Sequence, residues 1–140
     1  MTDNVILNKT DENIDLNNRS RILLIEDDAI NANVIQRFLK KHFIVDIGLN
    51  AVKGIELAKA NEYCLVLLDI NLGRGMSGVE VLHEIRLMEK FHKVPIIAST
   101  AYTMKGDKEK LLSEGFDDYI SKPYTMDEIN IKIKEYVKSF

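Results

Sequence analysis

The sequence lacks most of the features that mark secreted, membrane-spanning and zinc-binding proteins. A single cysteine among 140 residues excludes an internal disulfide, and no cysteine–histidine cluster has the spacing of a zinc site. The longest apolar run, from Cys64 to Leu68, has five residues, whereas a helix needs about 20 to span a bilayer. The start of the chain shows no basic segment followed by an apolar one, so no secretory signal is evident. These absences predict a cytoplasmic domain without a membrane segment.

An excess of charge of either sign is also missing. Lys and Arg number 19 and Asp and Glu number 22, which gives a formal net charge of −3. Binding to nucleic acid or anionic lipid requires a strongly basic face, which this balance does not favour, and no basic recognition helix is visible. A hydrophobic content of 46% and a length of 140 residues suit one globular domain.

Residues 1–20 differ from the rest of the chain. They contain five asparagines and only short apolar patches. We therefore predict a flexible N-terminal leader or linker, the alternative being one loosely docked helix. The folded domain is predicted to cover residues 21–140.

Short apolar runs alternate with helical periods from residue 21 onward. Strand patterns cover 22–25, 43–47, 64–68, 94–99 and 116–121, and helical periods cover 29–41, 50–61, 78–90, 104–114 and 125–139. The first helical period places Ile30, Val34 and Phe38 on the apolar face, with Ile35 beside it. This alternation predicts an α/β fold, a five-stranded parallel sheet with helices on both faces.

Polar side chains follow four of the predicted strands directly. They are Glu26, Asp27 and Asp28 after the first strand, Asp69 after the third, Thr100 after the fourth and Lys122 after the fifth. Parallel strands bring their carboxyl ends to one edge of the sheet, where α/β folds bind ligands. We therefore expect these side chains to lie close together at that edge.

These residue types suit phosphoryl transfer. Neighbouring carboxylates repel by roughly 4 kcal/mol at 4 Å in an effective dielectric of about 20, and hard oxygen ligands with open positions favour Mg²⁺. A carboxylate can attack phosphorus, a lysine can neutralise the transferred group, and a threonine hydroxyl can donate to a phosphoryl oxygen. Each residue alone is more often structural, and Asp28 is expected to be only a helix N-cap. Their joint arrival at one edge favours a functional site.

The remaining reactive side chains are expected to be structural. Cys64 begins an apolar strand and is predicted to be a buried small hydrophobe. The three histidines, His42, His83 and His92, have no ligand-like spacing and are assigned to the surface.

Ordered sequence blocks resemble the receiver domain of two-component response regulators. The blocks are ILLIEDD (22–28), LVLLDINL (65–72), MSGVEVL (76–82), PIIASTAY (95–102) and GFDDYISKP (115–123). The resemblance covers about residues 21–140. It implies the strand order 2-1-3-4-5, the flavodoxin-like arrangement of CheY-like proteins, with the first and third strands adjacent.

The resemblance also implies which residues bind metal and phosphate. Asp69 corresponds to the phosphoacceptor, Asp27 to a direct ligand of Mg²⁺, and Glu26 to a partner that acts mainly through a metal-bound water. The backbone carbonyl of Asn71 corresponds to a further metal ligand. Mn²⁺ is a second metal that this site would accept.

The same resemblance implies the residues of a conformational switch. Thr100 corresponds to the switch hydroxyl, and Ala101 and Lys122 to phosphate-binding positions. Tyr119 corresponds to the aromatic residue that changes rotamer when the threonine shifts. Pro123 corresponds to a structural position at which the preceding peptide bond is cis.

The loop over 70–78 departs from the family pattern. It lacks the usual proline, is one residue longer, and carries extra glycines at positions 73 and 75, which make positive φ available.

Tyr102 lies two residues after Thr100, where a bulky ring would shield an acyl phosphate from water. We therefore predict slow self-dephosphorylation, modulated by Tyr102 and Asn71; an unchanged rate of decay in Tyr102→Ala would contradict the role of the ring.

The predicted function is a phosphoacceptor signalling switch. A histidine kinase or histidine phosphotransfer protein would donate the phosphoryl group, and the fourth helix, fifth strand and fifth helix would present a changed face to a downstream protein. The domain would catalyse only its own phosphorylation and dephosphorylation, as a stand-alone regulator or as the receiver of a hybrid histidine kinase. Two alternatives remain open: a flavodoxin-like redox protein, which a colourless preparation would contradict, and a phosphohydrolase with an aspartate nucleophile, which multiple turnover on a phosphate monoester would support.

Overall fold

Strands and helices alternate along the described part of the chain, which comprises residues 20–73, 75–101 and 106–137 of a computed structural model. The strands are β1 (Ser20–Ile25), β2 (Phe43–Gly48), β3 (Leu65–Asp69), β4 (Ile96–Thr100) and β5 (Asp118–Ser121). The α-helices are α2 (Ala29–Leu39), α3 (Ala51–Ala60), α4 (Gly78–Arg86), α5 (Asp107–Glu114) and α6 (Met126–Lys134). A short 3₁₀ helix, Glu89–Phe91, follows α4.

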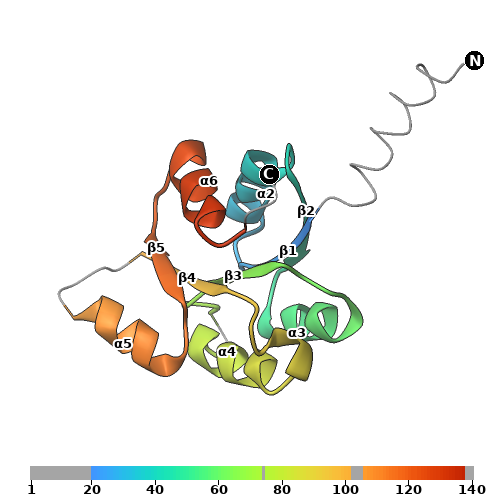
Figure 1. Ribbon diagram of the computed structural model, residues 1–140, viewed down its shortest axis with the longest axis vertical. Coiled ribbons are helices and arrows are strands. Elements are labelled where there is room, and N and C mark those ends of the chain that lie inside the picture. The colour runs from blue at the N-terminus through green and yellow to red at the C-terminus, as the bar shows by residue number, and fades with distance from the viewer. Residues whose placement is uncertain (1–19, 74, 102–105, 138–140) are drawn as a thin grey trace, which may run out of the picture.

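The strands form one parallel sheet in the order β2-β1-β3-β4-β5, which confirms the predicted topology. Figure 1 shows α2 and α6 on one face of the sheet and α3, α4 and α5 on the other. The order reverses between β1 and β3, which lie side by side. In open α/β sheets, the crevice at the carboxyl ends of two such strands is where ligands bind.

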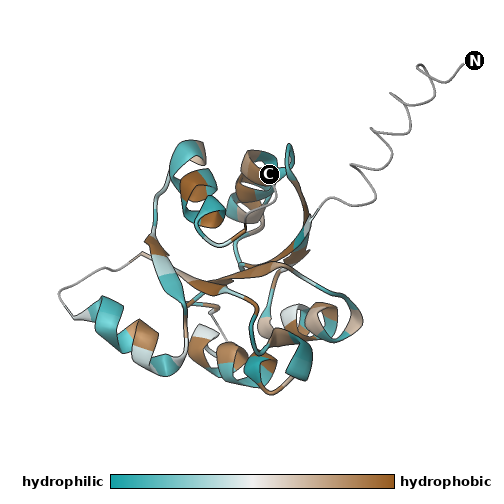
Figure 2. Ribbon diagram, viewed as in Figure 1, coloured by the Kyte–Doolittle hydropathy of each residue, from teal (hydrophilic) through white to brown (hydrophobic). Residues whose placement is uncertain are grey.

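The strands are apolar on both faces because helices cover both faces of the sheet. In β1, Ile22 and Leu24 pack with residues of α2 and α6, whereas Leu23 and Ile25 pack with residues of α3 and α4. All four side chains are almost completely buried. Figure 2 shows the resulting band of hydrophobic strands between the two helical layers. The continuous apolar runs of the sequence therefore form the centre of the core.

Side-chain caps determine where several helices begin. Asp28 accepts hydrogen bonds from backbone N–H groups in the first turn of α2, as predicted. Helix α4 begins with a capping box between Ser77 and Glu80, and α6 with one between Thr125 and Glu128. These caps set the lengths of the loops at the carboxyl edge of the sheet, where the site lies.

The apolar face predicted for α2 is wrong. The helix buries Ala32, Ile35 and Leu39, each at most 2% exposed, whereas Ile30 and Val34 are 78% and 38% exposed. Two apolar stripes run side by side along this helix. The stripe that contains the small side chain of Ala32 lies against the sheet because it permits a close approach with few voids. Ile30 and Val34 therefore form an exposed apolar pair.

Several predicted boundaries also shift. The helix predicted over 78–90 ends at Arg86, whose guanidinium binds carbonyl oxygens of the segment that follows. The strands predicted to begin at residues 94 and 116 begin at Ile96 and Asp118.

Cys64 precedes β3 and is only half-buried, so it is not a core residue of the strand. The three histidines are exposed, as predicted. Apart from Ser20 in β1, the predicted leader lies outside the described residues.

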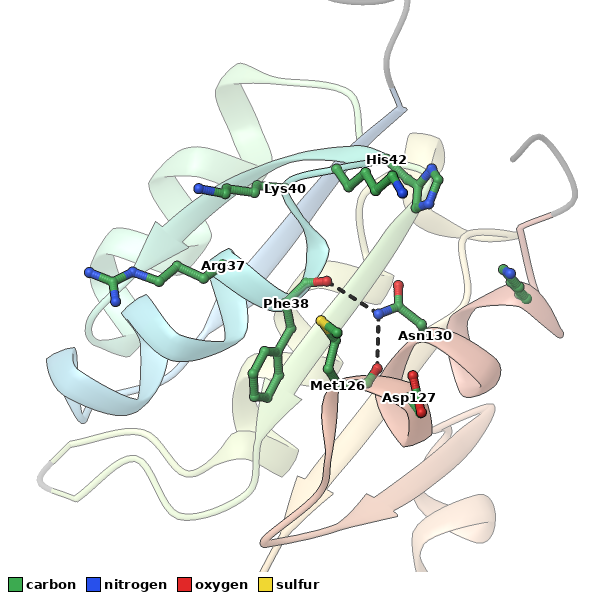
Figure 3. Close-up of a pocket in the computed structure, with 9 residues that line it drawn as sticks. Arg37, Phe38, Lys40, His42, Met126, Asp127 and Asn130 are labelled. Atoms are coloured by element: carbon green, nitrogen blue, oxygen red, sulfur yellow. Dashed lines mark hydrogen bonds between the residues drawn. The ribbon is translucent and has the colours of Figure 1, made fainter.

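A groove of about 640 Å³ runs between α2 and α6 (Figure 3). Asn130 of α6 joins the two helices there, because its side-chain amide donates to the carbonyl oxygen of Phe38 in α2 at 3.2 Å; the amide also donates to Met126 of its own helix at 2.8 Å. The hydrogen bond to Phe38 links the two helices that cover one face of the sheet.

The helices of the described ranges are short, and α2 has 11 residues. Most of them combine a buried face with a polar one. In the part of the chain that the structure describes, none has both the length and the apolar character that crossing a bilayer requires.

Candidate functional site

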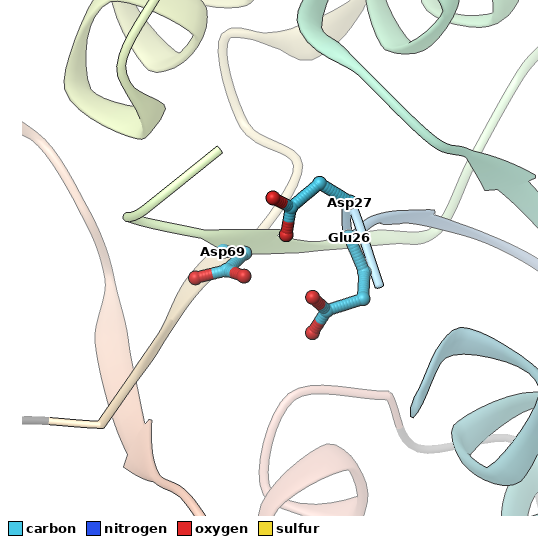
Figure 4. Close-up of side chains that lie close together, drawn as sticks. All are labelled: Glu26, Asp27 and Asp69. Carbon is cyan, nitrogen blue, oxygen red and sulfur yellow. The ribbon is translucent and has the colours of Figure 1, made fainter. Parts of the chain in front are cut away.

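Three carboxylates meet at the carboxyl edge of the sheet (Figure 4). Glu26 and Asp27 follow β1 directly, and Asp69 ends β3, the strand that pairs with β1. Each residue offers one oxygen, and these oxygens lie within 4.8 Å of one another. Glu26 and Asp69 are buried, whereas Asp27 is exposed. The cluster is therefore anchored in the core and open to solvent on the side of Asp27.

Lys122 adds a positive charge to this cluster from the end of β5. Its ammonium donates to Glu26 Oε1 at 2.7 Å and to Asp69 Oδ2 at 3.0 Å. The backbone N–H of Lys122 donates to the carbonyl oxygen of Thr100 at 2.8 Å, so the pairing of β4 and β5 continues up to the site. The fold thus brings together the predicted acidic residues and the predicted lysine, which come from three separate strands.

Burial and charge shift the protonation of these groups. Burial raises the pKa of the Glu26 carboxyl, Lys122 opposes this effect, and the nearby Asp69 adds to it. Burial alone would lower the pKa of Lys122, but its hydrogen bonds with Glu26 and Asp69 outweigh burial and raise it. Lys122 is therefore a cation at neutral pH.

The donor set fits a hard divalent cation. Three carboxyl groups face one ammonium in this cluster, so a divalent cation such as Mg²⁺ would offset its acidic character. Carboxylate oxygens are also the ligands that Mg²⁺ prefers, and it retains several waters, for which the exposed side at Asp27 provides access. Glu26, Asp27 and Asp69 are thus the side chains that could hold the metal.

The loop after β3 contacts Asp69 from the backbone. The N–H of Asn71 donates to Asp69 Oδ1 at 3.0 Å. The positive φ that the sequence makes available occurs at Gly73 and Gly75, with φ of 72° and 88°. A Cβ atom at position 78 would collide with the carbonyl oxygen of Asp69, so Gly78 permits α4 to begin directly against this backbone.

Thr100 and Ala101 lie at the end of β4. Thr100 is 4% exposed and, with Asn71, lines a pocket of about 270 Å³, whereas Ala101 is exposed. Tyr119 is paired in register with Ala98, two residues before Thr100, so Tyr119 and Thr100 face the same side of the sheet. That side is covered by α4 and α5, and Tyr119 is half-buried there.

Two other predicted residues flank this region of the chain. The peptide bond between Lys122 and Pro123 is cis, as the resemblance implies. Tyr102 lies outside the described residues, so its predicted effect on dephosphorylation stays a prediction.

Sequence reasoning missed Asn31, the third residue of α2. Its side-chain amide donates to Glu26 Oε1 at 2.9 Å, the same oxygen that Lys122 contacts. The contact spans five residues across the junction between β1 and α2, so neither strand alternation nor the three- and four-residue spacing of helix neighbours signals it.

Similar sequences place this site in a known family. A model of the response regulator receiver domain matches residues 22–134. The chain is 35% identical over 130 residues to hybrid signal transduction histidine kinase G of Dictyostelium discoideum, and 38% identical over 122 residues to the cell cycle response regulator CtrA of Brucella ovis. The alignments cover 90% and 84% of this chain, but 4% and 50% of these relatives. The chain thus spans half or less of the length of each.

Similar solved structures agree with this placement. The receiver domain of a sensor histidine kinase from Pseudomonas aeruginosa, solved with a magnesium ion coordinated in its active site cleft, matches with a TM-score of 0.77 at 31% identity, over 86% of this chain and 98% of that one. Chemotaxis protein CheY4 of Vibrio cholerae matches with a TM-score of 0.79 at 16% identity, over 84% and 98%, and supports the fold alone.

The family model therefore covers nearly all of the sheet and every strand-end residue that forms the acidic cluster. The chain belongs to the family of response regulator receiver domains of two-component signal transduction.

Proposed function

We propose that this domain is a phosphoacceptor switch in which Asp69 accepts a phosphoryl group from a phosphohistidine. The histidine belongs to a histidine kinase or a histidine phosphotransfer protein. The observation that carries the proposal is the position of Asp69, whose buried carboxylate lies 3.0 Å from the ammonium of Lys122 and within 4.8 Å of oxygens of Glu26 and Asp27.

The chemistry of the transfer follows from these contacts. An oxygen of Asp69 attacks the phosphorus, the bond between phosphorus and the imidazole nitrogen breaks, and its electron pair remains on the imidazole. The product is an acyl phosphate. Lys122 neutralises charge on the phosphoryl oxygens, while the backbone N–H of Asn71 fixes the orientation of Asp69 through Oδ1. Hydrolysis by water returns inorganic phosphate and the free carboxylate.

A divalent metal completes the proposed site. Glu26, Asp27 and Asp69 would hold it, together with the backbone carbonyl of Asn71. When bound, Mg²⁺ supplies further neutralisation of the phosphoryl charge, and Mn²⁺ has similar ligand preferences.

The proposed output face consists of α5, β5 and α6. Thr100 and Tyr119 support it, because they share one side of the sheet and lie on β4 and β5, next to these helices. A phosphoryl group on Asp69 would attract the hydroxyl of Thr100, and Tyr119 would move inward as the threonine shifts. A downstream protein responds only if it binds one of the two states more tightly than the other.

The exposed apolar pair on α2 is the proposed contact for the phosphohistidine partner. Ile30 and Val34 lie one turn apart, and Val34 lines a pocket that also contains Lys122, Pro123 and Tyr124. A helix that carries the histidine would bury this pair while presenting its phosphoryl group to Asp69.

Replacing Ile30 by glutamate tests this contact. We expect transfer from a phosphorylated histidine phosphotransfer protein to slow by about 10-fold, because a charge replaces a central apolar contact, while phosphorylation by acetyl phosphate keeps its rate. Val52→Glu is the matched control, since Val52 is 63% exposed on α3, on the opposite face of the sheet. Equal rates of protein-to-protein transfer in both variants would contradict the assignment of α2.

The experiment that tests the proposed function measures the mass of the intact protein after incubation with acetyl phosphate or phosphoramidate. With Mg²⁺, we expect an adduct of about 80 Da that a peptide digest assigns to Asp69, and with EDTA we expect none. Continuous release of phosphate from a monoester substrate, or a bound yellow cofactor, would instead support one of the two alternative functions.

A further inference from the structure

The first turn of α2 donates to Glu26 through a contact that the proposed mechanism does not use. The side-chain amide of Asn31 donates to Glu26 Oε1 at 2.9 Å, and Lys122 donates to the same oxygen at 2.7 Å. The backbone N–H of Asp28 donates to the other oxygen, Oε2, at 3.3 Å. The buried carboxylate of Glu26 is therefore held at both oxygens.

The start of α2 differs from the starts of α4 and α6. In those two helices, the glutamate at the third helical position accepts a hydrogen bond from the backbone N–H of the N-cap residue, as in an ordinary capping box. In α2 that position is Asn31, and Glu26 instead accepts from the N–H of the N-cap residue Asp28. The amide of Asn31 points back to Glu26. Glu26 thus replaces the glutamate of the capping box, and Asn31 fixes it there.

This arrangement matters because the ammonium of Lys122 has two carboxylate partners. It contacts Asp69 as well as Glu26, and a phosphoryl group on Asp69 would draw its ammonium toward the new negative charge. Glu26 Oε1 would then lose its contact with Lys122, while the contact with Asn31 comes from a helix and does not depend on that movement. A carboxylate that is 1% exposed needs such a donor, because a buried polar group without a hydrogen-bond partner is costly.

We propose that Asn31 is a positioning residue for the metal site, which holds the carboxylate of Glu26 in place and directed toward the cluster with Asp27 and Asp69. This inference rests on the proposed function, because it assigns Glu26 to the metal. Asn31 acts through Glu26 and contacts neither the metal nor the phosphoryl group.

The test compares Asn31→Leu, which has a similar volume and no donor, with the wild type. We expect the dissociation constant for Mg²⁺, measured by titration calorimetry without any phosphodonor, to rise by about 10- to 100-fold, the usual effect of removing a hydrogen-bond partner of a metal ligand. In phosphorylation by acetyl phosphate, the Mg²⁺ concentration for half-maximal rate should rise by the same factor, while the rate at saturating Mg²⁺ stays within about twofold of the wild type. A purely structural role of Asn31 would not raise the required Mg²⁺ concentration while leaving the rate at saturating Mg²⁺ unchanged.

Two further variants make the result decisive. Asn33→Leu is the control for helix composition, because Asn33 is exposed on the same helix and should leave Mg²⁺ binding unchanged. Asn31→Gln retains the amide and should recover most of the lost affinity. An Mg²⁺ affinity of Asn31→Leu equal to that of Asn33→Leu, or of Asn31→Gln as weak as that of Asn31→Leu, would overturn the inference.

The failure of the inference and that of the proposed function give different results. If the wild type forms the adduct on Asp69 but Asn31→Leu binds Mg²⁺ normally, only the role of Asn31 is wrong. If the wild type binds Mg²⁺ but forms no adduct, the proposed function is wrong, and the affinities still decide the role of Asn31. A wild type that does not bind Mg²⁺ would overturn both.

Discussion

Asp69→Asn is expected to abolish the Mg²⁺-dependent phosphoryl adduct while leaving the fold intact. The amide has nearly the shape of the carboxylate but cannot form an acyl phosphate, because its oxygen carries no full negative charge. The change also removes one of the carboxylates that repel each other in the cluster. Without Mg²⁺, the variant should therefore be at least as stable to thermal unfolding as the wild type. The measurement is intact mass after incubation with acetyl phosphate and Mg²⁺, together with thermal unfolding.

Asp28→Asn is the matched control for this experiment. Asp28 is the neighbour of Asp27 in the sequence, but its side chain caps α2, and asparagine caps a helix about as well as aspartate. We expect this variant to be phosphorylated like the wild type. An adduct of the same size on Asp69→Asn would show that another residue accepts the phosphoryl group, and would contradict the assignment of Asp69.

Lys122→Met is expected to give the largest loss of stability among substitutions in the site when Mg²⁺ is absent. The ammonium of Lys122 pairs with Glu26 and Asp69, whose side chains are 2% and 6% exposed. Removing one partner of a buried ion pair leaves uncompensated charge, so we expect the free energy of unfolding in EDTA to fall by about 3 kcal/mol. Phosphorylation should also become much slower, because no ammonium neutralises the transferred group.

Saturating Mg²⁺ should restore much of that stability. A ligand that binds only the folded state stabilises it by about 2.7 kcal/mol at 100 times its dissociation constant, and the variant retains all three carboxylates. Urea unfolding with EDTA and with Mg²⁺ measures both effects. Lys53→Met is the control, because Lys53 forms only an exposed ion pair with Glu56 and should change stability by less than about 0.5 kcal/mol. Unchanged stability of Lys122→Met in EDTA would contradict the electrostatic role of Lys122.

The strands were predictable because burial on both faces leaves a simple signal. Runs such as Leu65–Leu68 contain no polar residue, and a polar residue follows four of the five runs at the point where the strand leaves the core. Parallel pairing then places these polar residues at one edge. The cluster of Glu26, Asp27 and Asp69 could therefore be predicted, although the two strands that carry it, β1 and β3, are far apart in the sequence.

The orientation of α2 could not be predicted in the same way. Its sequence has two neighbouring apolar stripes, one with Ile30 and Val34 and one with Ile35 and Leu39, and both have helical spacing. The choice between them depends on how closely the helix backbone approaches β1 and β2, which the small side chain of Ala32 permits. Periodicity carries no information about that distance.

The sequence by itself determined the alternation of strands and helices, the polar residues at the carboxyl ends of the strands and the acidic residues of the site, because each of these depends on local hydrophobic patterns or on ordered motifs. Only the tertiary structure decided that Lys122 contacts both Glu26 and Asp69, that Asn31 shares an oxygen of Glu26 with it, and that Ile30 faces solvent. These features depend on the packing of elements that are far apart in the chain or that meet at an angle. Hydrogen bonds and burial at such junctions are set by distances of a few ångströms, which no spacing in the sequence encodes.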